Sequence, residues 1–269
     1  MNLKRLIFGF GLTLALAGQT LHAQPSDADG KQLADIRARA EKGDAKSQCA
    51  LGEAFYSGKL GVAQDYAEAV KWFREAAGQN DARAQYYLGD YYAFGPGATK
   101  DYAEAVKWYR KAAGQDYARA QYSLGVCCEF GRGVAQDYAE AVKWYGKAAG
   151  QNDAKAQFSL GVCYAKGRGV AQDHVEAVKL YGKAAEQGYA KAQINLGVCY
   201  FKGNDVAQDF AEAYKWCFLA TAQGNEEGKN TLTKIEGTMS SEQIAEGKRR
   251  ANDWLEQHKK ASAENSSQP

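Results

Sequence analysis

The stretch AQDYAEAVKWY, residues 135–145, decides the fold because it is written five times along the chain. Close copies occupy residues 63–73, 99–109, 171–181 and 207–217. The aspartates of the five copies follow one another at a constant interval of 36: Asp65, Asp101, Asp137, Asp173 and Asp209. A second segment, AQYSLGVCCEFG at 120–131, recurs with the same period. A fixed period of this size is typical of a repeat array.

Each unit is predicted to contain two helices. In the second unit, Ala84, Leu88 and Tyr91 follow helical spacing up to Gly95, where glycine ends a helix by taking a left-handed conformation. Asp101 then precedes Glu104 by three residues, a pattern that resembles a capping box at the start of a second helix. Each unit therefore consists of a first helix, named helix A, a loop that begins with glycine, and a second helix, named helix B.

A glycine lies inside every A helix, at Gly52, Gly89, Gly125, Gly161 and Gly197. Glycine there costs about 1 kcal/mol relative to alanine. Its recurrence indicates a compensating reason, and we expect close approach of the helix B backbone. Burial of the apolar side chains of one unit offsets only part of the conformational entropy lost when the unit folds, so neighbouring units are expected to stack.

The consensus A-x-A-Q-x-x-L-G-x-x-Y-x-x-G-x-G-V-x-x-D-Y-x-E-A-x-x-W-Y-x-x-A-A resembles the Sel-one-like repeat (SLR) family, a relative of tetratricopeptide repeats. The departures are small, such as Gly-Pro-Gly at 95–97 and Leu180 in place of tryptophan. The resemblance implies an all-α, α/α superhelical solenoid of stacked antiparallel helix pairs, used for protein–protein interaction and, in bacteria, often located in the envelope or outside the cell. The predicted units are 44–80, 81–116, 117–152, 153–188 and 189–225.

The amino terminus has the layout of a secretory signal peptide. A basic start with Lys4 and Arg5 precedes an apolar run at 6–17 and a small-residue site ending at Ala23. The run is too short to span a bilayer, and no cysteine follows it for lipidation. We therefore expect cleavage after Ala23. The protein is then expected to be periplasmic or secreted, without a lipid anchor or stable membrane insertion.

Both ends of the array are expected to carry caps. Residues 24–43 form a linker and a capping helix, in which Ile36 aligns with Phe73. Residues 226–257 are predicted to form two capping helices with Ser241 as N-cap, and 258–269 a disordered tail. Four residues of the second capping helix are expected to pack inward: Ile244, Ala251, Trp254 and Leu255.

Charge excludes one class of partner. Without Lys4 and Arg5 the chain has 34 − 2 = 32 basic and 32 acidic groups, so no overall field attracts nucleic acid. We expect a monomer with a protein or peptide partner.

The six cysteines are Cys49, Cys127, Cys128, Cys163, Cys199 and Cys217. Three of them, Cys127, Cys163 and Cys199, occupy one position in consecutive units, where stacked helices place equivalent atoms about 9–10 Å apart. That exceeds the roughly 7 Å limit of a disulfide. The pattern favours small core residues over disulfides and leaves the redox state open.

Catalytic motifs do not appear. Outside the signal segment the histidines are His174 and His258, and the sequence has no G-x-S-x-G, S-x-x-K, phosphate loop or H-E-x-x-H. We predict a protein that is not an enzyme and needs no cofactor or metal.

Variable positions of the A helices form the candidate binding surface, on the face that is concave in tetratricopeptide folds. A basic residue comes second in each A helix, and a ring often follows three residues later. We expect a groove for an extended or helical peptide, with these candidate residues: Lys46, Arg83, Arg119, Lys155, Lys191, Tyr86, Tyr122, Phe158, Asp90, Phe94 and Phe130. The alternative is that the basic residues are solvated surface and the rings are core between repeats.

The leading hypothesis is an exported, non-enzymatic scaffold that binds a protein or peptide. One alternative is an envelope hydrolase, because the cysteine-rich branch of the family resembles proteins proposed to bind or open β-lactams. Another is a secreted host-interaction factor, which would bind a host protein through the same kind of surface.

Overall fold

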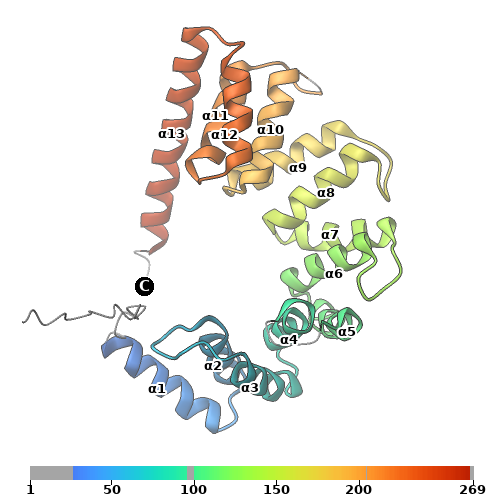
Figure 1. Ribbon diagram of the computed structural model, residues 1–269, viewed down its shortest axis with the longest axis vertical. Helices are drawn as coiled ribbons and strands as arrows, with labels where there is room; N and C mark the ends of the chain where they lie inside the picture. Colours follow the sequence, from blue (N-terminus) through green and yellow to red (C-terminus); the bar gives the residue numbers. More distant parts are fainter. Residues whose placement is uncertain (1–26, 96–99, 204, 267–269) are drawn as a thin grey trace, which may run out of the picture.

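The computed structural model describes residues 27–95, 100–203 and 205–266, in which the chain forms helices and no strands. The helices follow one another in antiparallel pairs, and the array curves into an open arc (Figure 1). Within the repeats, each helix packs against the next one along the chain. The predicted all-α solenoid is confirmed. The predicted signal peptide at 1–23 and its cleavage site lie outside the described residues.

Ten helices belong to the five repeats. The A helices are α2 (Ala45–Ser57), α4 (Ala82–Phe94), α6 (Ala118–Phe130), α8 (Ala154–Lys166) and α10 (Ala190–Lys202). The B helices are α3 (Tyr66–Gly78), α5 (Tyr102–Ala113), α7 (Tyr138–Gly150), α9 (His174–Glu186) and α11 (Phe210–Ala222).

The aspartate of the repeated motif begins every B helix. In α5 the backbone N–H of Glu104 donates to the Asp101 side chain at 2.9 Å, and the other four B helices have the same bond. The reciprocal half of a capping box is replaced by an ion pair, since Lys107 donates to Glu104 at 2.7 Å. The N-caps thus fix the start of helix B in each repeat.

Four A helices end at a glycine with positive φ, as predicted: Gly58, Gly131, Gly167 and Gly203. Gly95 differs, with φ −60° and ψ 130°. It precedes Pro96 in the sequence, and a residue before proline is forced toward extended backbone by the proline ring. The left-handed conformation expected at Gly95 was therefore wrong.

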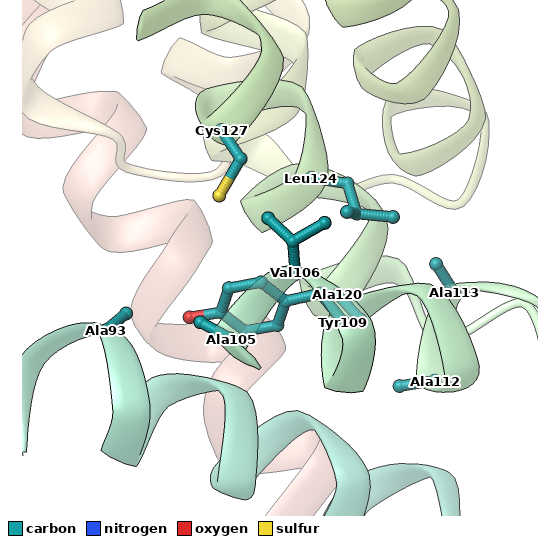
Figure 2. Close-up of a cluster of buried hydrophobic side chains, with 9 residues drawn as sticks. All are labelled: Ala93, Ala105, Val106, Tyr109, Ala112, Ala113, Ala120, Leu124 and Cys127. Carbon is teal, nitrogen blue, oxygen red and sulfur yellow. The ribbon is translucent and has the colours of Figure 1, made fainter. Parts of the chain in front are cut away.

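The glycine inside each A helix makes room for a side chain of helix B. A methyl group on Gly89 or Gly125 would lie 2.5 Å from the ring of Tyr109 or Tyr145. In the last repeat the sulfur of Cys217 takes the place of the ring, 2.6 Å away from the same point on Gly197. The approach expected of the backbone is thus made mainly by the ring. Figure 2 shows Tyr109 of α5 beside Val106, in the cluster that also holds Leu124 and Cys127 of α6.

Buried glutamines connect the start of helix A to the end of helix B in each repeat. The glutamine near the start of each A helix is at most 5% exposed. Its side-chain oxygen accepts a hydrogen bond from a glutamine that follows helix B of the same repeat, at 2.7–2.9 Å. The five pairs are Gln48 and Gln79, Gln85 and Gln115, Gln121 and Gln151, Gln157 and Gln187, and Gln193 and Gln223. Every buried amide therefore has a partner.

The amino-terminal cap is α1 (Asp27–Glu41). It packs against α2, and its buried Ile36 and Ala40 join Leu51 in one cluster. This is the arrangement expected of an isolated B-type helix.

The carboxyl-terminal cap consists of α12 (Glu226–Glu236) and α13 (Ser241–Ser266), both packed on α11. Ala251 is buried, and Trp254 lies 6.2 Å from Trp216, centroid to centroid. Two expectations were wrong. The N-cap is Ser240, which exchanges hydrogen bonds with Gln243, and not Ser241. Residues 258–266 are helical and continue α13, and they are not the disordered tail that was expected there. His258 stacks on Trp254 within this helix.

No helix in the described part of the chain is both long and apolar enough to cross a membrane.

Candidate functional site

A groove of about 660 Å³ runs across the A helices of three consecutive repeats. It is formed by α4, α6 and the start of α8, together with the loop before α10. The A face is therefore hollowed, as the candidate binding surface requires. Its lining residues are Tyr86, Asp90, Phe94, Arg119, Tyr122, Ser123, Asp153, Ala154, Lys155, Gln187, Gly188 and Tyr189.

Six of the eleven candidate residues meet in this groove: Tyr86, Asp90, Phe94, Arg119, Tyr122 and Lys155. The other five, Lys46, Arg83, Phe130, Phe158 and Lys191, are not among its lining residues.

The five basic residues are all exposed, but they differ in their partners. Arg83 forms an ion pair with Glu53 of the preceding repeat. Arg119 and Lys155 have no carboxylate of the described residues within ion-pair distance. Arg83 is therefore engaged within the protein, whereas the two cations of the groove point to solvent.

Asp90 is the half-buried acid of the groove. Its carboxylate accepts a hydrogen bond from the Tyr109 hydroxyl at 2.7 Å. Burial raises the pKa of Asp90, while hydrogen bonds from Tyr109 and Tyr86 and the charges of Lys155 and Arg119 act in the opposite direction. Burial beside Asp90 also raises the pKa of Tyr109 well above its usual value. This acid is thus held inside the wall of the groove.

Rings on the A helices serve packing and the groove together. Tyr86 is half-buried, with its centroid 6.0 Å from Tyr109 and 5.4 Å from Tyr117 of the next repeat. Tyr122 lies 5.8 Å from Tyr145. Phe158 packs in the same way, 5.8 Å from Tyr181 in helix B, but does not line the groove. Phe158 also lies 5.4 Å from Tyr189 of the next repeat, so it packs between repeats. Tyr86 and Tyr122 both pack on neighbouring rings and line the groove.

Phe94 and Phe130 are exposed by 55% and 57%. Phe94 lines the groove and packs edge-on to Tyr102, at 6.3 Å between centroids. Phe130 lies outside it, with the Arg132 guanidinium 5.3 Å from its ring.

A smaller pocket of about 180 Å³ adjoins the groove and shares Phe94, Tyr122 and Ser123 with it. Its other lining residues are Ala93, Tyr102, Tyr109, Val126, Cys127 and Arg132. This pocket was not predicted from the sequence. The sequence does contain an indication of it, because Ala93 is small whereas the equivalent position of the next repeat is Glu129.

Ser123, Asp153 and Tyr189 are further groove residues that the sequence analysis missed. Asp153 caps α8 by accepting from the Ala156 N–H at 2.8 Å. Tyr189 occupies the same cap position in α10 without a side-chain bond. A tyrosine that replaces a capping aspartate was the available signal, because it gives up a helix cap and exposes a ring.

The cysteines have buried thiols rather than reactive ones. All six are unpaired, and only Cys199 is not fully buried. Burial raises the pKa of Cys127 and Cys163 to about 11 and that of Cys217 to about 12. A thiolate nucleophile is therefore disfavoured at neutral pH. Within the described ranges, no group of three or more histidine, cysteine or acidic side chains is arranged to hold a metal ion.

The comparisons with known proteins agree with this architecture. The family model of the Sel1 repeat matches five times, at residues 45–81, 82–117, 118–153, 154–189 and 190–225. Each bound differs by one residue from that of the corresponding predicted unit, apart from the last, which is residue 225 in both. None of the curated proteins compared with the chain matches it.

Two solved structures are similar over most of the chain. A protective antigen of uropathogenic Escherichia coli that displays an SLR fold is 36% identical, with a TM-score of 0.71 over 84% of this chain and 52% of that one. A Sel1 repeat protein from Oxalobacter formigenes is 32% identical, with a TM-score of 0.74 over 87% of this chain and 95% of that one. The chain spans about half the length of the Escherichia coli protein.

Proposed function

Because the chain belongs to the Sel1 repeat family, we propose that it is an exported, non-enzymatic scaffold that binds a protein or peptide in the A-face groove. Proteins of this family are generally protein–protein interaction scaffolds. The groove supports the specific proposal, since it extends over three repeats and presents Arg119 and Lys155, which have no ion-pair partner among the described residues. A surface of this length suits a segment of chain better than a small molecule.

Export is the second part of the proposal. It is supported by the pattern of residues 1–23 and by the similarity to a protein described as a protective antigen. We propose a periplasmic or secreted protein that acts as a monomer.

Site-specific photocrosslinking tests the binding face. A photoreactive phenylalanine analogue replaces Ser123, which lines the groove. As a control, the same analogue replaces Lys107, an exposed residue of α5 that does not line the groove. In cells that express the full chain, we expect a discrete crosslinked species from position 123 and none from position 107. Equal crosslinking from both positions would contradict the proposal, because it would show contact without a preferred face.

A further inference from the structure

The charges that the groove offers to a ligand are positive. Arg119 and Lys155 are exposed, line the groove, and lack an ion-pair partner among the described residues. Arg83, one repeat earlier in the same position of its helix, is paired with Glu53. A cation that is not already paired can bind a new carboxylate without first losing an old one.

The acids of the groove are engaged. The Asp90 carboxylate accepts from the Tyr109 hydroxyl at 2.7 Å and is half-buried. Asp153 accepts from the Ala156 N–H at the start of α8. Both acids are half-buried and hydrogen-bonded within the protein, so the exposed charges of the groove are those of Arg119 and Lys155.

The adjoining pocket adds an apolar subsite. Small Ala93 lines it, whereas in the next repeat the equivalent Glu129 has a longer side chain that accepts from the Tyr145 hydroxyl at 2.7 Å. Its volume of about 180 Å³ exceeds the roughly 30 Å³ of one water molecule several times and admits an apolar side chain. Exposed Phe94 borders both the pocket and the groove.

We propose that the groove recognises an acidic peptide segment whose carboxylates pair with Arg119 and Lys155 while one apolar side chain enters the pocket under Ala93. The proposal rests on the scaffold function proposed above and names the chemistry of the partner. Carboxylates give orientation through charge, and the buried apolar side chain gives an anchor.

Fluorescence anisotropy with three labelled peptides tests this chemistry. The first peptide carries several glutamates around a single leucine. The second has lysine in place of every glutamate, and the third has serine in place of the leucine. We expect the mature protein to bind the first peptide at least tenfold more tightly than the second and several-fold more tightly than the third. Raising the salt concentration should weaken binding of the first peptide.

Two double variants of equal net charge separate the groove from the overall field. Arg119→Glu with Lys155→Glu should weaken binding of the first peptide at least tenfold. Lys46→Glu with Lys191→Glu changes the same helix position in α2 and α10, outside the groove, and should change the affinity by less than about threefold. Equal losses in both variants would overturn the proposal, since they would show a non-specific charge effect. All four residues are exposed, so an unchanged thermal melt is expected.

The apolar subsite has its own variants. Ala93→Leu fills the pocket, and Phe94→Ala removes its exposed rim without adding volume. Each should reduce the preference for the leucine peptide over the serine peptide. A preference that persists in both variants would place the apolar contact elsewhere and overturn this half of the proposal.

The experiments also distinguish this inference from the proposed function. If position 123 crosslinks a partner but the Arg119 and Lys155 double variant retains that partner and the acidic peptide does not compete, the acidic chemistry is wrong and the scaffold function stands. If position 123 crosslinks nothing, the proposed function itself fails.

Discussion

The glycine inside each A helix leads to a prediction whose sign is opposite to helix propensity. In an ordinary helix Gly→Ala stabilises by about 0.5–1 kcal/mol. At Gly125 the added methyl would lie 2.5 Å from two ring carbons of Tyr145, whereas carbons in contact are normally about 3.5–4.0 Å apart. The ring would have to move by roughly 1 Å. It is 0% exposed and lies 5.8 Å from Tyr122, centroid to centroid, so a shift disturbs its packing.

The energies favour destabilisation. Overpacking of this kind costs about 1–3 kcal/mol. Movement of the ring also strains the hydrogen bond from the Tyr145 hydroxyl to Glu129, and bonds to charged groups contribute about 1.5–3 kcal/mol. Even if only part of that bond is lost, these costs exceed the propensity gain. We therefore expect Gly125→Ala to lower the free energy of unfolding by roughly 2 kcal/mol and the melting temperature by about 4–8 °C.

Gly146 in α7 provides the matched control. A methyl group there meets no atom within 4 Å, so Gly146→Ala should raise the melting temperature by about 2 °C through helix propensity alone. Thermal unfolding followed by circular dichroism at 222 nm measures both variants. If Gly125→Ala proves as stable as the wild type, the close approach of Tyr145 does not explain the glycine.

Four further predictions follow from the caps, the buried amides and the thiols. Asp137→Ala should destabilise by about 1 kcal/mol in urea titration because the Glu140 N–H loses its acceptor, and Asp137→Asn should restore most of the loss. Gln121→Leu should lower the free energy of unfolding by about 1–3 kcal/mol, because buried Gln121 accepts a bond from the following helix end at 2.8 Å; equal stability would show that the amide pairs contribute nothing. Burial raises the pKa of Cys127 and Cys163 to about 11, so the stabilisation from their neutral thiols is complete below pH 9 and is lost as pH rises from 9 toward 11. Replacing both by alanine should flatten that part of the stability curve, and an unchanged slope would assign it to other groups. With a chromogenic β-lactam the protein should give no turnover, since these thiols are protonated at neutral pH; sustained turnover would favour the hydrolase alternative.

The local parts of this fold were predictable from the sequence. Asp101 and Glu104 are three residues apart, so the bond that starts α5 needs no distant neighbour. The period of 36 and the apolar spacing in each unit then predict stacked helix pairs, because each helix has one apolar face to bury. Where the prediction failed locally, at Gly95, the cause was also local: the proline that follows it.

The candidate site was predictable only in part. The sequence placed Arg83, Arg119 and Lys155 in one class, since they occupy the same position of their repeats. The structure separates them, because Glu53 lies thirty residues before Arg83 along the chain and reaches it only when α2 and α4 stack. The same holds for Asp90, whose carboxylate is engaged by the Tyr109 hydroxyl from α5.

Repetition specifies which residues are equivalent, and packing between repeats decides what each equivalent residue can do. Helix starts, helix stops and the period depend on neighbours within a few residues, so the sequence alone contains them. Which cations remain unpaired depends on side chains contributed by the preceding repeat. Whether a position lines a pocket, as Ala93 does, or accepts a hydrogen bond, as Glu129 does, depends on side chains contributed by neighbouring helices. Those contacts exist only after stacking, because burial and distance are set by the tertiary structure.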